Sequence, residues 1–201
     1  MQICSTAYQL FGSRIHIAYC TAEVTVSKGQ YEELLSIAKK AAEKKACSVV
    51  FIKPKVVFSD KILALAFYYA EKSFEQGFNI SRDLNLETLL YLSATRQISR
   101  VLEKTAWNPA DKKAFICCCS LEDSPSELLL ETLELLNSTY CSCRLKPDLS
   151  YIRDLYGITE EEIAATSSNS LLDKMFKLVS SRLALFFAEN SRKASLPPKL
   201  N

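Results

Sequence analysis

The chain has 201 residues, of which 48% are hydrophobic and 24% are charged, and its formal net charge is +2 at pH 7. This length is sufficient to bury one substantial core, and the spread of aromatic and β-branched residues argues against wholesale disorder. The nearly balanced charge excludes a strongly basic nucleic-acid footprint over the whole chain, so any such site must be a local cluster of Lys and Arg.

The first half of the chain alternates between strand and helix patterns. Two alternating runs predict a hairpin with its turn at Gly12-Ser13, and a helical pattern follows. An apolar run ended by Pro54 predicts a strand buried on both faces. Ser59 can then cap a helix that closes at Gly77. The predicted elements are strands at 3–10 and 14–20, a helix at 27–45, a strand at 47–52 and a helix at 59–76.

The second half opens with another apolar run, 86–92, which we predict to be a buried strand that breaks through a polar corner into a short helix ending near Lys104. Gly157 is predicted to stop a later short helix. Helix start signals, two of them capping boxes, occur at Ser124, Thr159 and Ser170. The remaining predicted elements are a strand at 114–119, a helix at 124–136, a short strand within 138–147 and helices at 148–156 and 171–188.

These elements together predict an α/β fold, with a single domain in which helices pack against a mixed sheet and a long C-terminal helix completes the chain. We assign residues 1–188 to this domain. Residues 189–201 contain two adjacent prolines and several basic side chains, and we expect them to form a flexible basic C-terminal tail.

The C-terminal helix carries more apolar surface than a single core-facing stripe requires. Either the helix lies wedged between the sheet and its neighbours, or part of its surface binds a partner. Its apolar side chains form two seams at helical spacing, one of Leu172, Met175, Phe176, Val179, Leu183 and Phe186 and the other of Leu171, Leu178 and Leu185.

Eight cysteines and a single histidine, His16, raise the question of disulfides, metals or catalysis. No secretory signal is recognisable, so we expect a reducing compartment and a soluble cytoplasmic protein, also nuclear if the cell is eukaryotic. The consecutive Cys117 to Cys119 and the C-x-C of Cys141 and Cys143 lack the usual spacing of zinc ligands, and we expect no metal. No stretch approaches the roughly 18 apolar residues of a membrane span.

The sequence lacks the familiar catalytic and cofactor motifs. Four glycines, at 12, 29, 77 and 157, cannot assemble a phosphate loop or a dinucleotide-binding turn, so no cofactor is expected. The positive signal is a set of basic residues beside element ends, each of which alone is most often a surface charge. Arg96 is the strongest candidate, because a guanidinium near free backbone amides at a helix start suits a phosphate. The set comprises Lys61, Lys72, Arg82, Arg96 and Arg100.

The segment 89–104, LLYLSATRQISRVLEK, resembles the signature segment of the small KEOPS subunit that binds the kinase of that complex, the PRPK-binding protein family. Weaker similarity extends over residues 1–188, with departures near Glu43, at 74–82, at 107–113 and after Ala188. The resemblance implies a non-catalytic α/β protein that docks on the amino-terminal lobe of a kinase-like ATPase. It further implies that the protein presents tRNA, held by its 3′ CCA end, for threonylcarbamoyladenosine formation.

Carried over by residue, the resemblance implies tRNA binding by Arg96, Gln97 and Ile98, with looser support for the other basic residues. It also implies no membrane partner and no small-molecule substrate. Two other classes stay open: a regulatory kinase-binding module that does not contact RNA, and a small-molecule enzyme that uses His16 or the 117–119 cysteines. The looser tRNA-binding positions are Arg100, Lys61, Lys72 and Arg82, and the implied kinase-docking positions are Leu171, Leu172, Met175 and Leu178.

Overall fold

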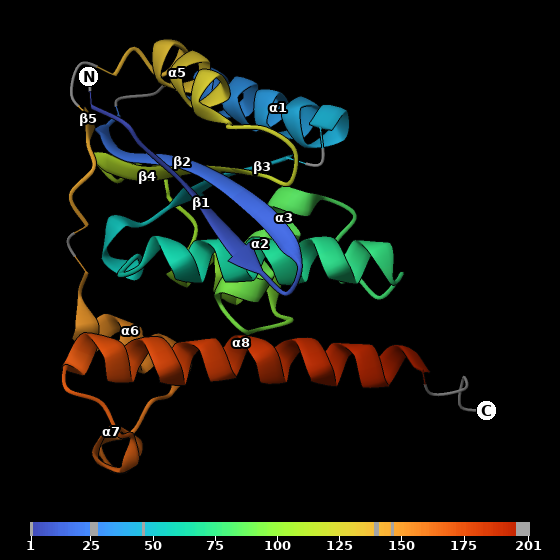
Figure 1. Cartoon of the computed structure of the whole chain (residues 1–201). Helices are drawn as coiled ribbons and strands as arrows, with labels where there is room; N and C mark the ends of the chain where they lie inside the picture. Colours follow the sequence, from blue (N-terminus) through green and yellow to red (C-terminus); the bar gives the residue numbers. More distant parts are fainter. Residues whose placement is uncertain (1, 25–27, 46, 139–140, 146, 196–201) are drawn as a thin grey trace.

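An antiparallel sheet separates two layers of helices in the computed structural model of the chain (Figure 1). The structure describes residues 2–24, 28–45, 47–138, 141–145 and 147–195. The predicted α/β fold, with helices against one sheet and a long C-terminal helix, is therefore confirmed.

The sheet has the strand order β1-β2-β4-β3, with β5 paired to β2. A mixed sheet was predicted, whereas every strand pair in the described part of the chain is antiparallel. β2 and β3 do run in the same direction, as a strand-helix-strand unit requires, but β4 lies between them and runs opposite to both. The strands are β1 (Cys4–Leu10), β2 (Ser13–Glu23), β3 (Cys47–Ile52), β4 (Lys113–Ser120) and β5 (Cys141–Ser142).

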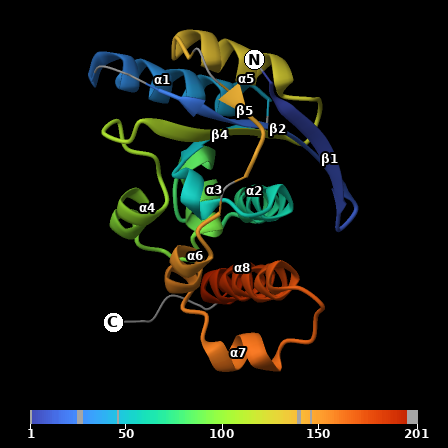
Figure 2. The same ribbon diagram turned by 90° about the vertical axis from the view of Figure 1, so that its left-hand side faces the viewer.

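Two helices cover one face of the sheet and two cover the other, and a further long helix lies outside the second pair (Figures 1 and 2). The covering pairs are α1 (Lys28–Lys45) with α5 (Ser126–Leu135), and α2 (Asp60–Glu75) with α3 (Leu84–Leu92). The outer layer contains α8 (Leu171–Ser195). Shorter elements are the 3-10 turn η1 (Pro54–Val56), α4 (Ile98–Lys104), α6 (Leu149–Tyr156) and α7 (Glu160–Ala165).

The sheet is buried on both faces along β3 and β4, which explains the continuous apolar runs of these two strands, whereas the edge strand β1 alternates between half-buried and exposed residues. All six residues of β3 are buried, as predicted. In β4, Cys117 and Cys119 join the core beneath α2 and α8, whereas Cys118 and Ile116 join the core beneath α1 and α5. The three consecutive cysteines therefore alternate between two separate cores.

Several predicted helix boundaries are confirmed by their hydrogen bonds. The side chain of Thr159 and that of Glu162 form the reciprocal capping box at the start of α7. The hydroxyl of Ser170 accepts a bond from the amide of Asp173 at 3.1 Å. Gly157 ends α6 with a left-handed φ of 60°, a conformation that favours glycine.

The prediction of a strand at 86–92 is wrong, since this run forms helix α3. No residue of this helix is exposed, because it lies between the sheet and α8, so its sequence shows no clear amphipathic period. Its start is fixed by the carboxylate of Asp83, which accepts bonds from two backbone amides, and by Glu87, which accepts from the amides of Ile80 and Ser81. The aspartate at the N-cap position is a helix-start signal that the strand prediction did not use.

Three further boundaries differ from the predictions. The hairpin turn consists of Phe11 and Gly12, because Ser13 already pairs with Leu10. Ser124 does not cap α5, because its hydroxyl bonds the hydroxyls of Ser5 and Ser126 instead. Helix α8 continues to Ser195, beyond its predicted end at 188, so the first part of the predicted flexible tail is helical. The rest of that tail, 196–201, lies outside the described residues.

Candidate nucleic-acid interface and partner surface

Arg96 lies in the tight turn between α3 and α4, as the sequence predicted for a binding corner. The turn is shaped by Ala94, whose φ of 45° is left-handed, and it leaves the side chain of Arg96 exposed. The guanidinium donates a hydrogen bond to the side-chain oxygen of Asn190 in α8 at 2.5 Å. None of the ion pairs among the described residues involves Arg96. The guanidinium is thus held in place by a neutral amide and keeps its charge accessible.

The other corner residues have different roles. Gln97 is exposed at the start of α4, and Ile98 is 43% exposed. Arg100 donates to the backbone carbonyl of Leu155 at 3.0 Å and so ties α4 to α6. Arg96, Gln97 and Ile98 therefore form one exposed corner, while part of the hydrogen-bonding capacity of Arg100 is used within the fold.

A second basic surface lies on α2. Tyr68 and Lys72 follow Lys61 by seven and eleven residues, which places all three on one face of the helix. The ammonium of Lys61 lies 5.4 Å from the ring centre of Phe176 in α8. The ammonium of Lys72 lies 5.8 Å from the ring centre of Tyr68 and 2.6 Å from a carboxylate oxygen of Glu75. The carboxylate of Glu75 therefore competes with a phosphate for the ammonium of Lys72.

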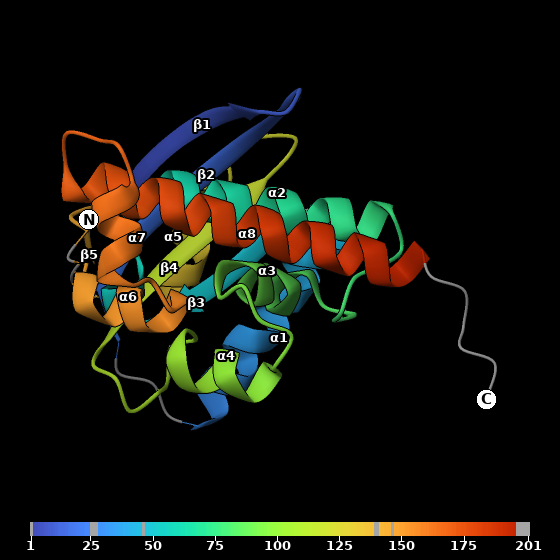
Figure 3. The same ribbon diagram turned by 90° about the horizontal axis from the view of Figure 1, so that it is seen from below.

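The structure does not gather all the predicted basic residues in one patch. Helices α2 and α4 lie on different sides of α3, and α8 runs between them when the molecule is seen from below (Figures 2 and 3). Lys61 meets α8 at Phe176, whereas Arg96 meets it at Asn190, roughly 21 Å farther along the helix at 1.5 Å per residue. Arg82 is exposed just before α3. The candidate interface is thus two surfaces that share α8 as a common wall.

The structure adds an aromatic residue that the sequence reasoning missed. Phe11 is 71% exposed at the tip of the β1–β2 hairpin, and its ring centre lies 5.2 Å from that of Tyr68 on α2. An aromatic residue in a two-residue hairpin loop, where Asn or Gly is usual, was the available signal. Phe11 extends the α2 surface with an exposed ring.

Helix α8 uses only part of its apolar surface for the core. Leu171, Leu172 and Leu185 are 47%, 48% and 56% exposed, and Leu178 is partly buried. Met175 is fully buried, so its predicted place in a docking surface is corrected to a place in the core. Leu171 and Leu185, with the partly buried Leu178 between them, leave an apolar strip along one side of the helix. Leu172 instead lies in line with the buried Val179 and Leu183 and is exposed at the start of the helix.

Two of the three candidate catalytic cysteines are not activated. Cys117 and Cys118 are fully buried, and burial raises the pKa of both thiols well above the ordinary value, which keeps them protonated at neutral pH. The described residues contain no group of three or more potential metal ligands. Within the same described ranges, no helix is long and apolar enough to cross a membrane.

Comparison with known protein families identifies the family of this chain. The model of the family described as "Kinase binding protein CGI-121" matches residues 24–185. The chain belongs to this family. A search of curated proteins found no match. The matched range contains α2, α4 and most of α8, and therefore every site residue that the sequence predicted.

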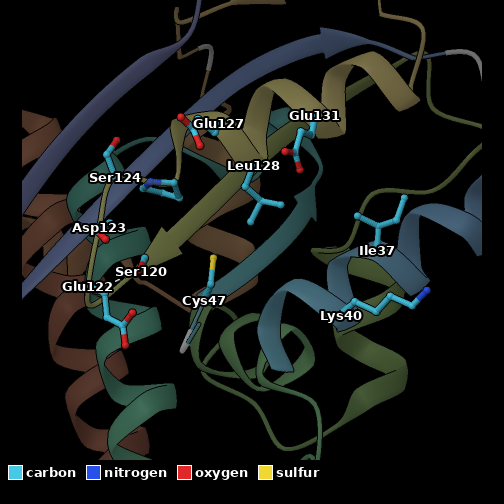
Figure 4. A pocket seen from close by; sticks show the side chains of 11 residues that line it. Ile37, Lys40, Cys47, Ser120, Glu122, Asp123, Ser124, Glu127, Leu128 and Glu131 are labelled. Atoms are coloured by element: carbon cyan, nitrogen blue, oxygen red, sulfur yellow. Dashed lines mark hydrogen bonds between the residues drawn. The ribbon is translucent and has the colours of Figure 1, made fainter. Parts of the chain in front are cut away.

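The CGI-121 family protein also has a pocket of ≈ 440 Å³ on the other side of the sheet, next to α1 and α5 (Figure 4). Ile37, Leu128 and the thiol of Cys47 contribute apolar wall, and Lys40 supplies one ammonium group. Four carboxylates stand at the rim of the pocket, and their negative charge repels phosphate, so this pocket does not fit a nucleic acid. The rim carboxylates belong to Glu122, Asp123, Glu127 and Glu131.

Proposed function

We propose that this kinase-binding protein is a non-catalytic subunit of the KEOPS tRNA-modification complex. In this role it binds the kinase-like ATPase subunit and recruits tRNA through its 3′ CCA end for threonylcarbamoyladenosine formation. The observation that carries the proposal is the family match, which spans the fold from the end of β2 to α8. The buried, protonated thiols of Cys117 and Cys118 are unsuited to act as nucleophiles, which is consistent with a non-catalytic role for these two residues.

For the kinase, the proposed docking surface is the exposed strip of α8. Leu171 and Leu185 are fourteen residues apart, which places them on nearly the same side of the helix with Leu178 between them. Exposed leucines at this spacing fit an apolar groove on a partner. Leu172 adds exposed apolar surface at the start of the helix.

For tRNA, the proposed contacts are a few cations on both sides of α8. Arg96 supplies an oriented guanidinium, and Lys61 and Lys72 supply ammonium groups beside aromatic rings. So few charges give a weak, salt-sensitive affinity for a single-stranded end. When this weak RNA-binding surface is linked to other tRNA-binding subunits, the effective concentration of tRNA at the complex rises, and no active site is required in this chain.

A regulatory kinase-binding module that does not contact RNA is the second candidate. It is favoured by the internal bonds of the candidate cations, since Arg96 bonds Asn190, Arg100 bonds Leu155 and Lys72 pairs with Glu75. Under this alternative, replacing Arg96 or Lys61 with Ala leaves the activity of the assembled complex unchanged.

Titration of the purified protein with intact tRNA, and with tRNA that lacks its 3′ end, tests the proposal at two salt concentrations. We expect the intact tRNA to bind more tightly, and the difference to shrink as salt rises. Equal binding of both RNAs would refute the CCA-end assignment. Co-purification of the kinase-like ATPase with the wild-type protein tests the other half of the proposal separately.

A further inference from the structure

The β1–β2 hairpin has an unusual residue at its tip. Ser13 pairs with Leu10, so the loop consists of Phe11 and Gly12 alone. Both have positive φ, 48° and 88°, as in the type I′ turns that two-residue hairpins prefer. Glycine or asparagine adopts this conformation readily, whereas a bulky side chain such as Phe11 is strained in it.

Burial does not account for the phenylalanine. Phe11 is 71% exposed, which is the largest exposed fraction among the large apolar side chains that the structure describes. The hairpin tip projects away from the centre of the sheet (Figure 3), and it contacts α2 through the rings of Phe11 and Tyr68. A strained backbone that presents an exposed ring points to a function for that ring.

The ring is the open end of an aromatic series that runs from the hairpin tip over α2 to α8. The ring centres are 5.2 Å apart between Phe11 and Tyr68, 5.6 Å between Tyr68 and Tyr69, and 4.8 Å between Tyr69 and Phe187 of α8. The series continues to Phe78 at 5.3 Å. These contacts hold the ring of Phe11 in place, so binding of a ligand to this ring costs less side-chain entropy.

Cations flank the exposed end of this series. Lys61 and Lys72 lie on the same face of α2 as Tyr68, one on each side of it along the helix. Alternating ammonium groups and aromatic rings are the usual means by which proteins bind single-stranded nucleic acid, because rings stack on bases and ammonium groups contact phosphates. An apolar protein partner would not require the two flanking charges.

We propose that Phe11 and Tyr68 form a stacking shelf for an unpaired base of RNA, with Lys61 and Lys72 contacting the adjacent phosphates. This inference rests on the proposed function, because it specifies where the single-stranded end of tRNA is held. It goes beyond that function by assigning base stacking to the hairpin tip, which lies outside the range 24–185 of the family match.

Phe11→Asn is the decisive variant, because asparagine suits the left-handed turn and the hairpin should keep or gain stability. We expect this variant to bind intact tRNA about tenfold more weakly, in line with the loss of one stacked base. Phe11→Trp should bind intact tRNA as tightly as the wild type does. tRNA without its 3′ end should bind the wild type and Phe11→Asn equally. Leu35→Asn, at an exposed leucine on α1, is the matched control.

Stacking is measured directly with 2-aminopurine in place of the terminal adenosine of the tRNA. Its fluorescence should be quenched by the wild type and by Phe11→Trp, and recover with Phe11→Asn. If Phe11→Asn binds tRNA and quenches fluorescence like the wild type while Lys61→Ala binds more weakly, the stacking shelf is refuted and the proposed function stands. Unchanged binding in both variants, together with equal binding of intact and truncated tRNA by the wild type, would overturn both the shelf and the proposed tRNA contact. Loss of kinase co-purification in Phe11→Asn, with tRNA binding intact, would reassign the ring to a protein contact.

Discussion

The guanidinium of Arg96 donates a hydrogen bond to the side-chain oxygen of Asn190, which lies 94 residues farther along the chain. Asn190 is almost fully buried, and its amide nitrogen has no hydrogen-bond partner among the described residues. The bond therefore fixes the direction of the guanidinium from inside the domain. It also ties the binding corner to α8, the helix that carries the exposed leucines.

Replacing Arg96 with Ala should weaken tRNA binding about tenfold, because one charge-assisted phosphate contact is lost. The slope of log affinity against log salt should become shallower by about 0.7, the value expected for one phosphate contact on a single strand. Asn190→Ala should lower the affinity less and leave the slope unchanged, since the charge remains and only its direction is lost. Binding isotherms at several salt concentrations measure both, and an unchanged slope in Arg96→Ala would remove this residue from the interface.

Replacing Glu75 with Gln should strengthen tRNA binding about two- to threefold, because a carboxylate no longer competes with phosphate for the ammonium of Lys72. The free energy of unfolding should change by less than about 0.5 kcal/mol, as is usual for an exposed ion pair. Glu23→Gln is the control, since Glu23 pairs with Lys113 at the end of the sheet. A gain of affinity in both variants would indicate a general charge effect.

Replacing Leu185 or Leu172 with Asp should abolish co-purification of the kinase and leave the fold intact, because both side chains are about half exposed. Leu135→Asp, on α5 across the sheet, should bind the kinase normally. Met175→Ala should instead destabilise the domain by about 2–5 kcal/mol, since it opens a cavity in the core. Thermal melts and pull-downs separate these outcomes, and normal kinase binding by both α8 variants would exclude this surface.

Glu71 makes stability depend on pH in an unusual direction. Burial, with a contribution from the nearby Glu75, raises the pKa of its carboxyl to about 7, and one carboxyl oxygen has no hydrogen-bond partner among the described groups. Between pH 4.5 and 7 the folded state therefore holds a proton that the unfolded state has released, so the free energy of unfolding falls as pH rises.

Glu71→Gln should flatten this dependence and stabilise the protein by about 1–3 kcal/mol at pH 8. Urea unfolding at pH 5, 6, 7 and 8 measures the effect. A wild-type stability that rises through this range, or a variant curve parallel to that of the wild type, would contradict the assignment.

Local patterns predicted much of the fold. The strand β3 was readable because a short run with five apolar residues is followed closely by Pro54, and the start of α7 because its capping box depends on neighbours in sequence. Helix α3 was not readable from periodicity, because a helix buried on all sides and a buried strand both appear as continuous apolar runs. Its identity depended on Asp83 and Glu87, whose carboxylates bind backbone amides.

The candidate site was readable only in part. Exposure of the corner at Arg96 followed from its place between two elements, but its bond to Asn190 joins positions that no local pattern relates. The exclusion of Met175 from the docking surface depended on how α8 rotates against α2 and α3. The position of Phe11 depended on a one-residue shift of the hairpin turn, which strand alternation does not resolve.

Helix α8 borders both candidate surfaces, since it contacts Lys61 through Phe176 and Arg96 through Asn190, while its outer leucines stay open. A kinase that holds this helix more rigidly would order these side chains in advance, so RNA binding would cost less conformational entropy. Thermodynamic linkage then requires the converse, that bound RNA tightens the grip of the kinase by an equal factor. The placement of one helix would thus make the two associations cooperative.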